Sequence, residues 1–245
     1  MFLRQLFDPE SSTYSYLLAD EQTGKAVLID PVLEQVDRDL TLISELGFSL
    51  EYTLETHVHA DHVTGAGVIR ERVGSQSIMS KVDGASCADI LVDDGEVVCF
   101  GRYGLEARAT PGHTAGCTSW VTLDQKAIFT GDALLIRSCG RTDFQGGDSR
   151  RLFHSIHDHI FSLPDDTTVY PAHDYTGRTC STVGEEKRLN PRLGGGRSID
   201  EFVVIMDGLN LPQPKRMDEV LPANLDCGII HLETARTQKT RPVED

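Results

Sequence analysis

Four side chains that can bind a metal ion lie within six consecutive residues of the chain: His57, His59, Asp61 and His62. They follow residues 51–56 (EYTLET), whose composition predicts a short strand. Side chains two positions apart on an extended chain point to the same side, so His57 and His59 can face one metal ion. Imidazole and carboxylate together suit zinc, iron or manganese, and the spacing alone does not choose among these metals.

Three further residues of the ligand type follow predicted strands elsewhere in the sequence. His113 follows residues 105–110, Asp132 follows residues 126–130, and His173 follows residues 167–170, each with a neighbouring glycine or proline. The ends of strands at one edge of a sheet converge in space, and loops at such edges usually carry function. The seven residues together therefore predict a metal site assembled from loops that are distant in sequence.

The elements that would position these residues alternate between strand and helix patterns. Residues 13–20 and 26–30 predict a hairpin with Gly24 in its turn, and hydrophobic periodicity predicts helices over 33–47, 62–74 and 149–164. Further strands are expected over residues 76–80, 96–100, 105–110, 119–123, 126–130 and 167–173. This order favours a mixed α/β layer architecture.

The sequence changes character beyond residue 175. Residues 176–197 are rich in glycine and polar side chains, and Ser198 and Glu201 have the spacing of a capping box that opens a helix. Residues 211–228 contain three prolines and are expected to be irregular. We therefore expect a catalytic domain over 1–175, a C-terminal extension packed on it over 176–232, and a flexible tail over 233–245.

Composition and charge restrict the classes of partner. The formal net charge of the 245-residue chain is −15, which argues against binding to nucleic acid or to a membrane surface. The sequence shows no apolar stretch long enough to cross a bilayer and no leader pattern at its start. A cytoplasmic protein is expected, or a protein of the mitochondrial matrix if a transit peptide has been removed.

The six cysteines stand at 87, 99, 117, 139, 180 and 227, without a Cys-x-x-Cys pair. This scatter predicts reduced thiols and neither a structural zinc site nor a disulfide framework. Cys227 is expected to be a buried thiol, with a role in handling sulfur as the alternative.

Three histidines, at positions 154, 157 and 159, lie on the predicted helix 149–164. His154 and His157 are three positions apart and could clamp a metal, but a solvated or partly packed helix face is favoured. His231 is close to the end of the sequence, and no catalytic role is expected for it.

The ligand pattern resembles that of the metallo-β-lactamase superfamily, whose members have an αββα sandwich of two mixed sheets with helices on the outer faces. The surrounding sequence is similar to one family within it, the persulfide dioxygenases, also called sulfur dioxygenases or the ethylmalonic encephalopathy protein family. The resemblance runs from Phe2 to Cys227, and residues 138–144 and 181–186 are its most specific parts. The stretches that carry it are THVHADHVTGAG, RATPGHTAGC, FTGDALLIRSCGRTDFQGG, YPAHDY, STVGEEKRLNPRL and LPANLDCG.

The resemblance implies oxidation of glutathione persulfide by O2 to sulfite and glutathione. It also implies one Fe(II) per chain, bound by the residues that match the family's ligands, His57, His113 and Asp132. Two histidines and one carboxylate form a facial triad that leaves positions on the metal open for both reactants. The remaining four ligand-type residues would surround the iron, with His59 close to it but outside its coordination. Members of the family commonly pair, so a homodimer is also an expectation.

Glutathione carries carboxylates, so an acidic protein needs local basic or hydroxyl groups to hold it. Arg141 and Tyr175 are the first candidates for substrate contact, and Lys215 and Arg216 in the extension are further ones. The alternative for each is a solvated charge or, for Tyr175, a packed ring.

Two other functions stay open on the sequence alone. A glyoxalase-II-type hydrolase would use the same seven residues to hold two metals and hydrolyse acyl-glutathione thioesters. Such enzymes carry a larger helical C-terminal domain, whereas only 72 residues (174–245) follow His173 here. A fold that has lost catalysis and serves as a binding module is the second alternative, and the filled ligand positions argue against it.

Overall fold

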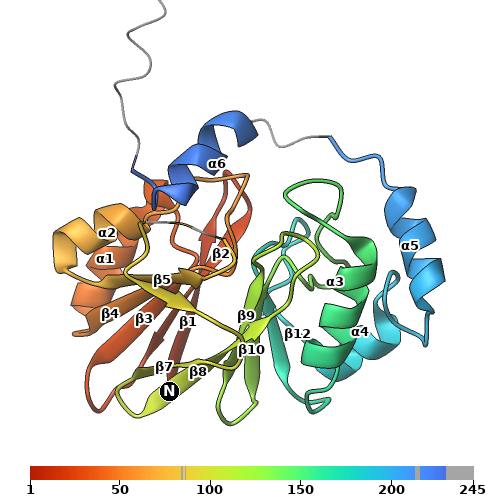
Figure 1. Ribbon diagram of the computed structural model, residues 1–245. Helices are drawn as coiled ribbons and strands as arrows, with labels where there is room; N and C mark the ends of the chain where they lie inside the picture. The colour runs from red at the N-terminus through yellow and green to blue at the C-terminus, as the bar shows by residue number, and fades with distance from the viewer. Residues whose placement is uncertain (84, 86, 213–215, 230–245) are drawn as a thin grey trace, which may run out of the picture.

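Two six-stranded sheets pack face to face in the computed structural model, which describes residues 1–83, 85, 87–212 and 216–229. Helices cover both outer faces of this pair of sheets, as Figure 1 shows. The predicted αββα sandwich is therefore confirmed.

The first sheet has its strands in sequence order, antiparallel from β1 to β3 and parallel from β3 to β6. Its strands are β1 (Phe2–Asp8), β2 (Thr13–Ala19), β3 (Lys25–Ile29), β4 (Ser49–Leu54), β5 (Gln76–Ser80) and β6 (Ile90–Val92). A short 3₁₀ turn, η1 (Leu33–Gln35), leads into α1 (Val36–Glu45), which covers the outer face of this sheet together with α2 (Ala66–Val73).

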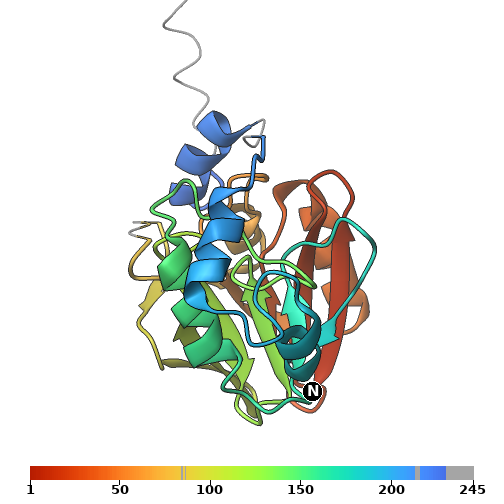
Figure 2. The same ribbon diagram turned by 90° about the vertical axis from the view of Figure 1, so that its right-hand side faces the viewer.

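The second sheet also follows the chain and is antiparallel except for the parallel pair β10 and β11. Its strands are β7 (Val97–Phe100), β8 (Tyr103–Ala109), β9 (Thr118–Thr122), β10 (Ala127–Gly131), β11 (Thr168–Pro171) and β12 (Ser181–Thr182). The helices on its outer face are α3 (Ser149–Ser155), continued by the π-helical turn η2 (Ile156–Ile160), α4 (Val183–Leu189) and α5 (Ile199–Asp207). Figure 2 shows α3 and α5 side by side on this face.

Alternation of side chains along the strands builds three apolar layers. In β2, Tyr16 points into the space between the sheets and packs with Trp120 and Phe129 of the second sheet. Its neighbour Leu17 points the opposite way and packs with Ile43 of α1. This alternation is the pattern that a period of two residues dictates for a strand buried on both faces.

The sequence-based prediction of elements is wrong in several places. Strands β1, β6 and β12 and helix α4 were not expected, and α2 begins at Ala66 rather than at residue 62. Residues 211–228 were expected to be irregular, but α6 (Met217–Leu225) is a helix that contains Pro222. Its Val220 and Ala223 are buried against Val63, and this packing outweighs the hydrogen bond that the proline cannot donate. The capping box of α5, formed by Ser198 and Glu201, is confirmed.

The expectation that all six cysteines are reduced is also wrong. Cys87 and Cys227 form a disulfide, while Cys99, Cys117, Cys139 and Cys180 are free. The two bonded cysteines are 140 residues apart and meet only because α6 folds back onto the loop between β5 and β6. Spacing in the sequence could not reveal such a contact.

None of the helices in the described part of the chain is long and apolar enough to cross a membrane. The division into a domain over 1–175 and an extension over 176–232 stays a prediction. The predicted tail over 233–245 lies outside the described residues.

Candidate metal centre

The ligand-type residues meet at the end of the sandwich where β4, β10 and β11 end. His57 follows β4, His113 lies in the loop between β8 and β9, and Asp132 follows β10. One ligand atom of each of these three lies within 4.8 Å of those of the other two, and the same holds for a second group, His59, Asp61 and His173. The ring of His62 lies 4.3 Å from that of His59, so the structure brings all seven predicted residues together.

Hydrogen bonds fix which nitrogen of His57 and His113 is available to a metal. His113 Nδ1 lies 2.7 Å from the carbonyl oxygen of Arg141, which can only accept, so Nδ1 carries the proton. The Thr56 hydroxyl donates to Asp30 and therefore accepts from His57 Nδ1, at 3.0 Å. Nε2 is therefore the nitrogen of each ring that is free to bind a metal, and that of His113 lies 3.6 Å from Asp132 Oδ2.

In the second group, too, a ring nitrogen faces carboxylate oxygens. His173 Nδ1 donates to the carbonyl oxygen of Ser12 (3.2 Å), and its Nε2 lies 3.6 Å from Asp61 Oδ2 and 3.7 Å from Asp132 Oδ1. His62 Nε2, both ring nitrogens of His59 and Asp132 Oδ1 are buried without a hydrogen-bond partner among the described residues. Buried polar atoms without hydrogen bonds are costly, and a cation between the ring nitrogens and carboxylate oxygens would satisfy them, so these residues fit a metal ion.

Burial keeps the imidazoles of His57 and His59 neutral, which is the form that binds a metal. Burial lowers the pKa of His57 well below its ordinary value, and His59 and His113 lower it further. Burial likewise lowers the pKa of His59, with a contribution from His62. Burial alone would raise the pKa of Asp132, but His173 and His113 hold that pKa below its ordinary value, so the carboxylate is charged.

Two buried carboxyl groups behind His59 were not predicted from the sequence. Asp30 Oδ1 lies 3.2 Å and Glu55 Oε2 lies 3.6 Å from His59 Nε2. Both lie on the Nε2 side of the ring, whereas Nδ1 faces Asp61 at 3.9 Å. Carboxylates commonly orient metal-binding histidines in this way. Their positions at strand ends, after β3 and β4, were the available sequence signal.

A pocket of about 550 Å³ opens above the first group of ligands, His57, His113 and Asp132, all of which line it. Apolar side chains form part of its wall: Ala60, Leu135, Phe144, Leu211 and Pro212. Its polar and charged lining includes Ser138, Arg141, Tyr175 and Arg192. A ligand of moderate size can therefore reach the metal-binding atoms with both apolar and charged contacts.

Arg141 lines this pocket but directs its guanidinium to protein groups. It forms two contacts of 2.6 Å with Asp143 and donates to the carbonyl oxygens of Pro212 (2.7 Å) and Leu211 (3.3 Å). Its Cζ also lies 4.3 Å from the centre of the Phe144 ring. Arg141 thus fastens residues 211 and 212 to the rim of the pocket.

The other residues predicted to contact substrate do not all line this pocket. Tyr175 lines the pocket, 75% exposed, with its ring parallel to that of His173. Arg216 pairs with Glu34 (3.6 Å) and Glu219 (3.4 Å) and lines an adjoining pocket of about 390 Å³ instead. Lys215 lies outside the described residues.

Arg192 is a pocket residue that the sequence analysis missed. It is half-buried and donates from Nη1 to the carbonyl oxygen of Cys139 at 2.8 Å. Because it belongs to the glycine-rich stretch after residue 175, only the fold of that stretch brings it to the pocket. The thiol of Cys139 lies beside it, and burial raises the pKa of this thiol to about 11 despite Arg192, so the thiol stays protonated.

The remaining histidines lie away from the centre. His154 is exposed, 3.9 Å from Asp158, and His157 stacks on Phe153 with ring centres 3.9 Å apart. The solvated and partly packed helix face predicted for them is therefore confirmed. His231 lies outside the described residues.

Comparison with known proteins agrees with this geometry. The family model of the metallo-beta-lactamase superfamily matches residues 8–173. The human protein "Persulfide dioxygenase ETHE1, mitochondrial" is 54% identical over 94% of this chain and 89% of its own length. The crystal structure of ETHE1 from Myxococcus xanthus matches with a TM-score of 0.90 and 52% identity, over 94% of this chain and all of that one.

A hydrolase of the same superfamily is a more distant relative. The hydroxyacylglutathione hydrolase of Brucella anthropi is 36% identical, over 68% of this chain and 63% of its own length. The higher identity and nearly complete coverage lie with the dioxygenases. The chain therefore belongs to the persulfide dioxygenase family of the metallo-β-lactamase superfamily, a family of metal-binding enzymes.

Proposed function

We propose that the chain oxidises glutathione persulfide with O2 and water to sulfite and glutathione, at one Fe(II) held by His57, His113 and Asp132. The observation that carries this proposal is the meeting of two imidazoles and one charged carboxylate at the pocket, with ligand atoms within 4.8 Å of one another. This donor set is the one that non-heme iron oxygenases use. When bound, the iron supplies electrons to dioxygen and open coordination positions, which redox-inactive zinc could not do.

The protein's own residues would orient the metal ligands and control the environment of the substrate. The carbonyl oxygen of Arg141 and the hydroxyl of Thr56 fix the rings of His113 and His57. The apolar wall around Leu135 and Phe144 limits water near the reacting sulfur. The raised pKa of Cys139 prevents its thiol from competing for the sulfane sulfur, because the thiolate is the nucleophile.

The substrate-binding roles follow from the pocket lining. We assign Arg192 as the residue that binds one carboxylate of glutathione. The hydroxyl of Tyr175 would form a hydrogen bond with a polar group of the substrate. Arg141 would act on substrate through the wall that it fastens, as well as by its charge at the rim. Arg216 and Lys215 stay predicted contacts for a part of the substrate that extends beyond this pocket.

The four remaining ligand-type residues, His59, Asp61, His62 and His173, would surround the iron without holding a second one. His59 would lie close to the iron, oriented by Asp30 and Glu55. A hydrolase of the glyoxalase-II type would instead fill both groups with metal. Metal stoichiometry therefore separates the two functions.

The decisive experiment is anaerobic purification followed by elemental analysis and an oxygen-electrode assay with glutathione persulfide. One iron per chain with oxygen uptake and sulfite formation is the expected result. Two metals per chain with hydrolysis of S-lactoylglutathione would overturn the proposal in favour of the hydrolase. Protein that takes up no iron and shows no turnover would point to a binding module.

Substitution of the two pocket arginines tests the assignment of the glutathione carboxylate. Arg192→Ala should raise the KM for glutathione persulfide by roughly ten-fold or more, since a hydrogen bond to a charged group is worth about 1.5–3 kcal/mol. Arg141→Ala should also raise the KM, and it should lower kcat because the wall at residues 211 and 212 loosens. The exposed Arg151→Ala serves as the control, and an unchanged KM in Arg192→Ala would refute the assignment.

The place of the protein in the cell and its assembly stay predictions. The human relative is named as mitochondrial. We propose the cytoplasm or the mitochondrial matrix for this chain, and a homodimer as its assembly.

A further inference from the structure

One buried side chain of helix α6, Asn224, forms hydrogen bonds to the metal-ligand segment, residues 57–64. The amide nitrogen of Asn224 donates to the carbonyl oxygens of His59 (2.9 Å) and His62 (2.8 Å). Its amide oxygen accepts from the backbone nitrogen of Thr64 at 2.8 Å. Because these residues belong to no helix or strand, their backbone groups need such partners. Asn224 thus fixes the path of the backbone that carries four of the seven ligand-type side chains.

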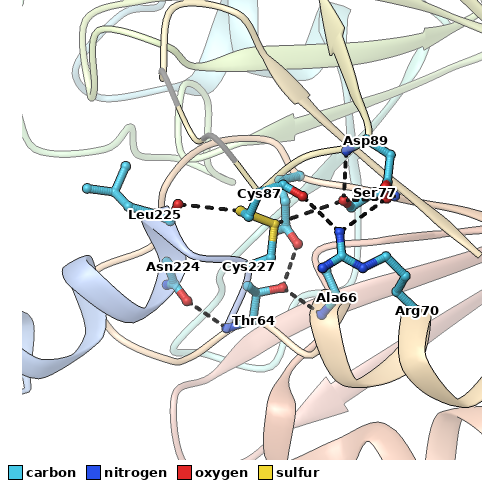
Figure 3. The surroundings of a disulfide bond; sticks show 10 residues. Thr64, Ala66, Arg70, Ser77, Cys87, Asp89, Asn224, Leu225 and Cys227 are labelled. Atoms are coloured by element: carbon cyan, nitrogen blue, oxygen red, sulfur yellow. Dashed lines mark hydrogen bonds and ion pairs between the residues drawn. A yellow bond between two sulfur atoms is a disulfide. The ribbon is translucent and has the colours of Figure 1, made fainter. Parts of the chain in front are cut away.

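The disulfide between Cys87 and Cys227 joins the chain just after this helix to the loop between β5 and β6 (Figure 3). The carbonyl oxygen of Cys227 accepts from the backbone nitrogen of Gly67, and that of Cys87 accepts from Arg70 Nη1. Both acceptors therefore hold α2, the helix that follows the ligand segment directly. A Cβ atom on Gly67 would lie 2.6 Å from the Cys227 oxygen, so the approach is close.

Apolar side chains also link the region around Cys87 to the ligand segment. Val58, which stands between His57 and His59, packs in a small apolar cluster with Met79 and Ala85. Cys87 and Leu221 of α6 pack against this cluster as well. The disulfide therefore ties together two segments that both touch the ligand segment.

Apart from this covalent bond, α6 is held within the described residues by a few buried side chains and their hydrogen bonds. Its buried side chains are Val220, Ala223 and Asn224, and Pro222 removes one hydrogen bond of the helix. A helix of this length is marginal unless packing supports it. The disulfide therefore helps to keep Asn224 in its hydrogen bonds with the ligand segment.

We propose that the Cys87–Cys227 disulfide is a redox-sensitive latch that keeps Asn224, a positioning residue, on the ligand segment. With the disulfide formed, the ligands are held in the geometry that binds metal. Reduction releases α6 and loosens residues 57–64, which speeds the loss of metal. The latch acts on the ligands whichever reaction they serve, so it goes beyond the proposed function.

The chemical step is thiol–disulfide exchange with a small thiol such as glutathione. A first thiolate attacks the sulfur of Cys87, which is part-exposed whereas Cys227 is 1% exposed, and Cys227 leaves as a thiolate that takes up a proton. A second thiol then releases Cys87 from the mixed disulfide. Two protein thiols and one oxidised glutathione result, so two electrons pass from two glutathione molecules to the protein.

Counting thiols tests whether the bond exists in the full-length protein. Protein purified in air, denatured without reductant and alkylated with iodoacetamide should carry four adducts, on Cys99, Cys117, Cys139 and Cys180. After reduction it should carry six. Six adducts without reduction would overturn the proposal, and this readout does not depend on any enzymatic activity.

Hydrogen exchange and metal release test the coupling to the ligand segment. Reduction with a phosphine should speed amide exchange in residues 57–67 and raise the rate of ferrous iron loss to ferrozine by roughly ten-fold, an effect of the size found for outer-shell partners. Amides of β9 and β10 provide the internal control. Equal exchange and equal iron loss in the oxidised and reduced proteins would refute the latch.

Three variants separate the bond from the side chain that it positions. Cys87→Ser should release iron like the reduced protein and should no longer respond to the reductant, whereas Cys180→Ser, at an exposed free cysteine, should behave as wild type. Asn224→Asp keeps the acceptor for Thr64 but loses both donors, so it should release iron faster with the disulfide intact. Wild-type release rates in both Cys87→Ser and Asn224→Asp would also refute the proposal.

Discussion

Gly140 has no room for a side chain, because it lies between two of the predicted iron ligands. A Cβ atom there would lie 2.3 Å from the Asp132 carbonyl oxygen and 2.8 Å from His113 Cγ. Its backbone nitrogen also donates to that carbonyl oxygen at 2.8 Å. The backbone after β10 and the ring of His113 are thus packed against each other through this glycine.

We expect Gly140→Ala to displace His113 or Asp132 and so to weaken metal binding. Overpacking of this kind costs about 1–3 kcal/mol of folding free energy. Urea unfolding of the metal-free protein measures that cost, and iron stoichiometry measures the effect on the site. Gly208→Ala is the control, since a Cβ atom there meets only ordinary contacts. Full iron content and unchanged stability in Gly140→Ala would contradict this account.

The sequence predicts the ligand residues better than the substrate pocket for a physical reason. His57, His59, Asp61 and His62 are close in the chain, so local geometry alone brings them together. Arg192 reaches the pocket only through the fold of α4 and the turn after it, and no local pattern encodes that path. The hydrogen bond from Arg141 to the Pro212 carbonyl oxygen could not be predicted either, because the two residues are 71 positions apart in the sequence.

At the scale of elements, Asp20 at the end of β2 ties the first sheet to the turn between β7 and β8 of the second. Its carboxylate accepts from Arg102 Nε (3.0 Å), Nη2 (2.7 Å) and the backbone nitrogen (3.0 Å). The hydrogen bonds from Arg102 hold the pKa of Asp20 well below its ordinary value. The two sheets are therefore linked by a charged contact as well as by apolar packing.

This depressed pKa gives the contact a defined pH dependence. A carboxyl group whose pKa is lower in the folded state contributes stability above its unfolded pKa, about 3.9, and loses it as the pH falls towards the folded pKa. Asp20→Asn should therefore lower the urea midpoint at pH 7, and the difference from wild type should shrink below about pH 4. A difference that is equally large at pH 3 and pH 7 would show that the charge of Asp20 does not matter.

The elements that the sequence did not predict are those whose stability comes from elsewhere in the fold. Strand β1 has a half-exposed pattern without clear alternation and is held by its pairing with β2. Helix α6 contains a proline and is held by burial and by the disulfide. Strands β2 to β5 and β8 to β10, in contrast, carry apolar side chains with the expected period or in buried runs, and they were predicted.

At the scale of the whole molecule, the metal centre draws on both sheets. His57 and His59 lie in the loop after a strand of the first sheet. His113, Asp132 and His173 lie in loops that follow strands of the second sheet. A metal that binds only the folded protein adds about 4 kcal/mol when its concentration is about a thousand times its Kd. In a chain of this size each kcal/mol shifts the Tm by about 2–4 °C.

Removal of iron with a chelator should therefore lower the Tm by about 10 °C. Calorimetry of anaerobic protein with and without stoichiometric Fe(II) measures this shift. Asp132→Ala, which lacks the carboxylate, should show a low Tm that iron does not raise. A Tm that is the same with and without iron would mean that the metal does not hold the sheets together.

The two sheets are consecutive in the chain, since β1 to β6 end at Val92 and β7 begins at Val97. A cut between these residues would yield an N-terminal fragment with His57, His59, Asp61 and His62 and a C-terminal fragment with His113, Asp132 and His173. Neither fragment would contain all three predicted iron ligands, His57, His113 and Asp132. Iron uptake would then report the reunion of the two fragments, and the protein could be used as a split sensor of proximity.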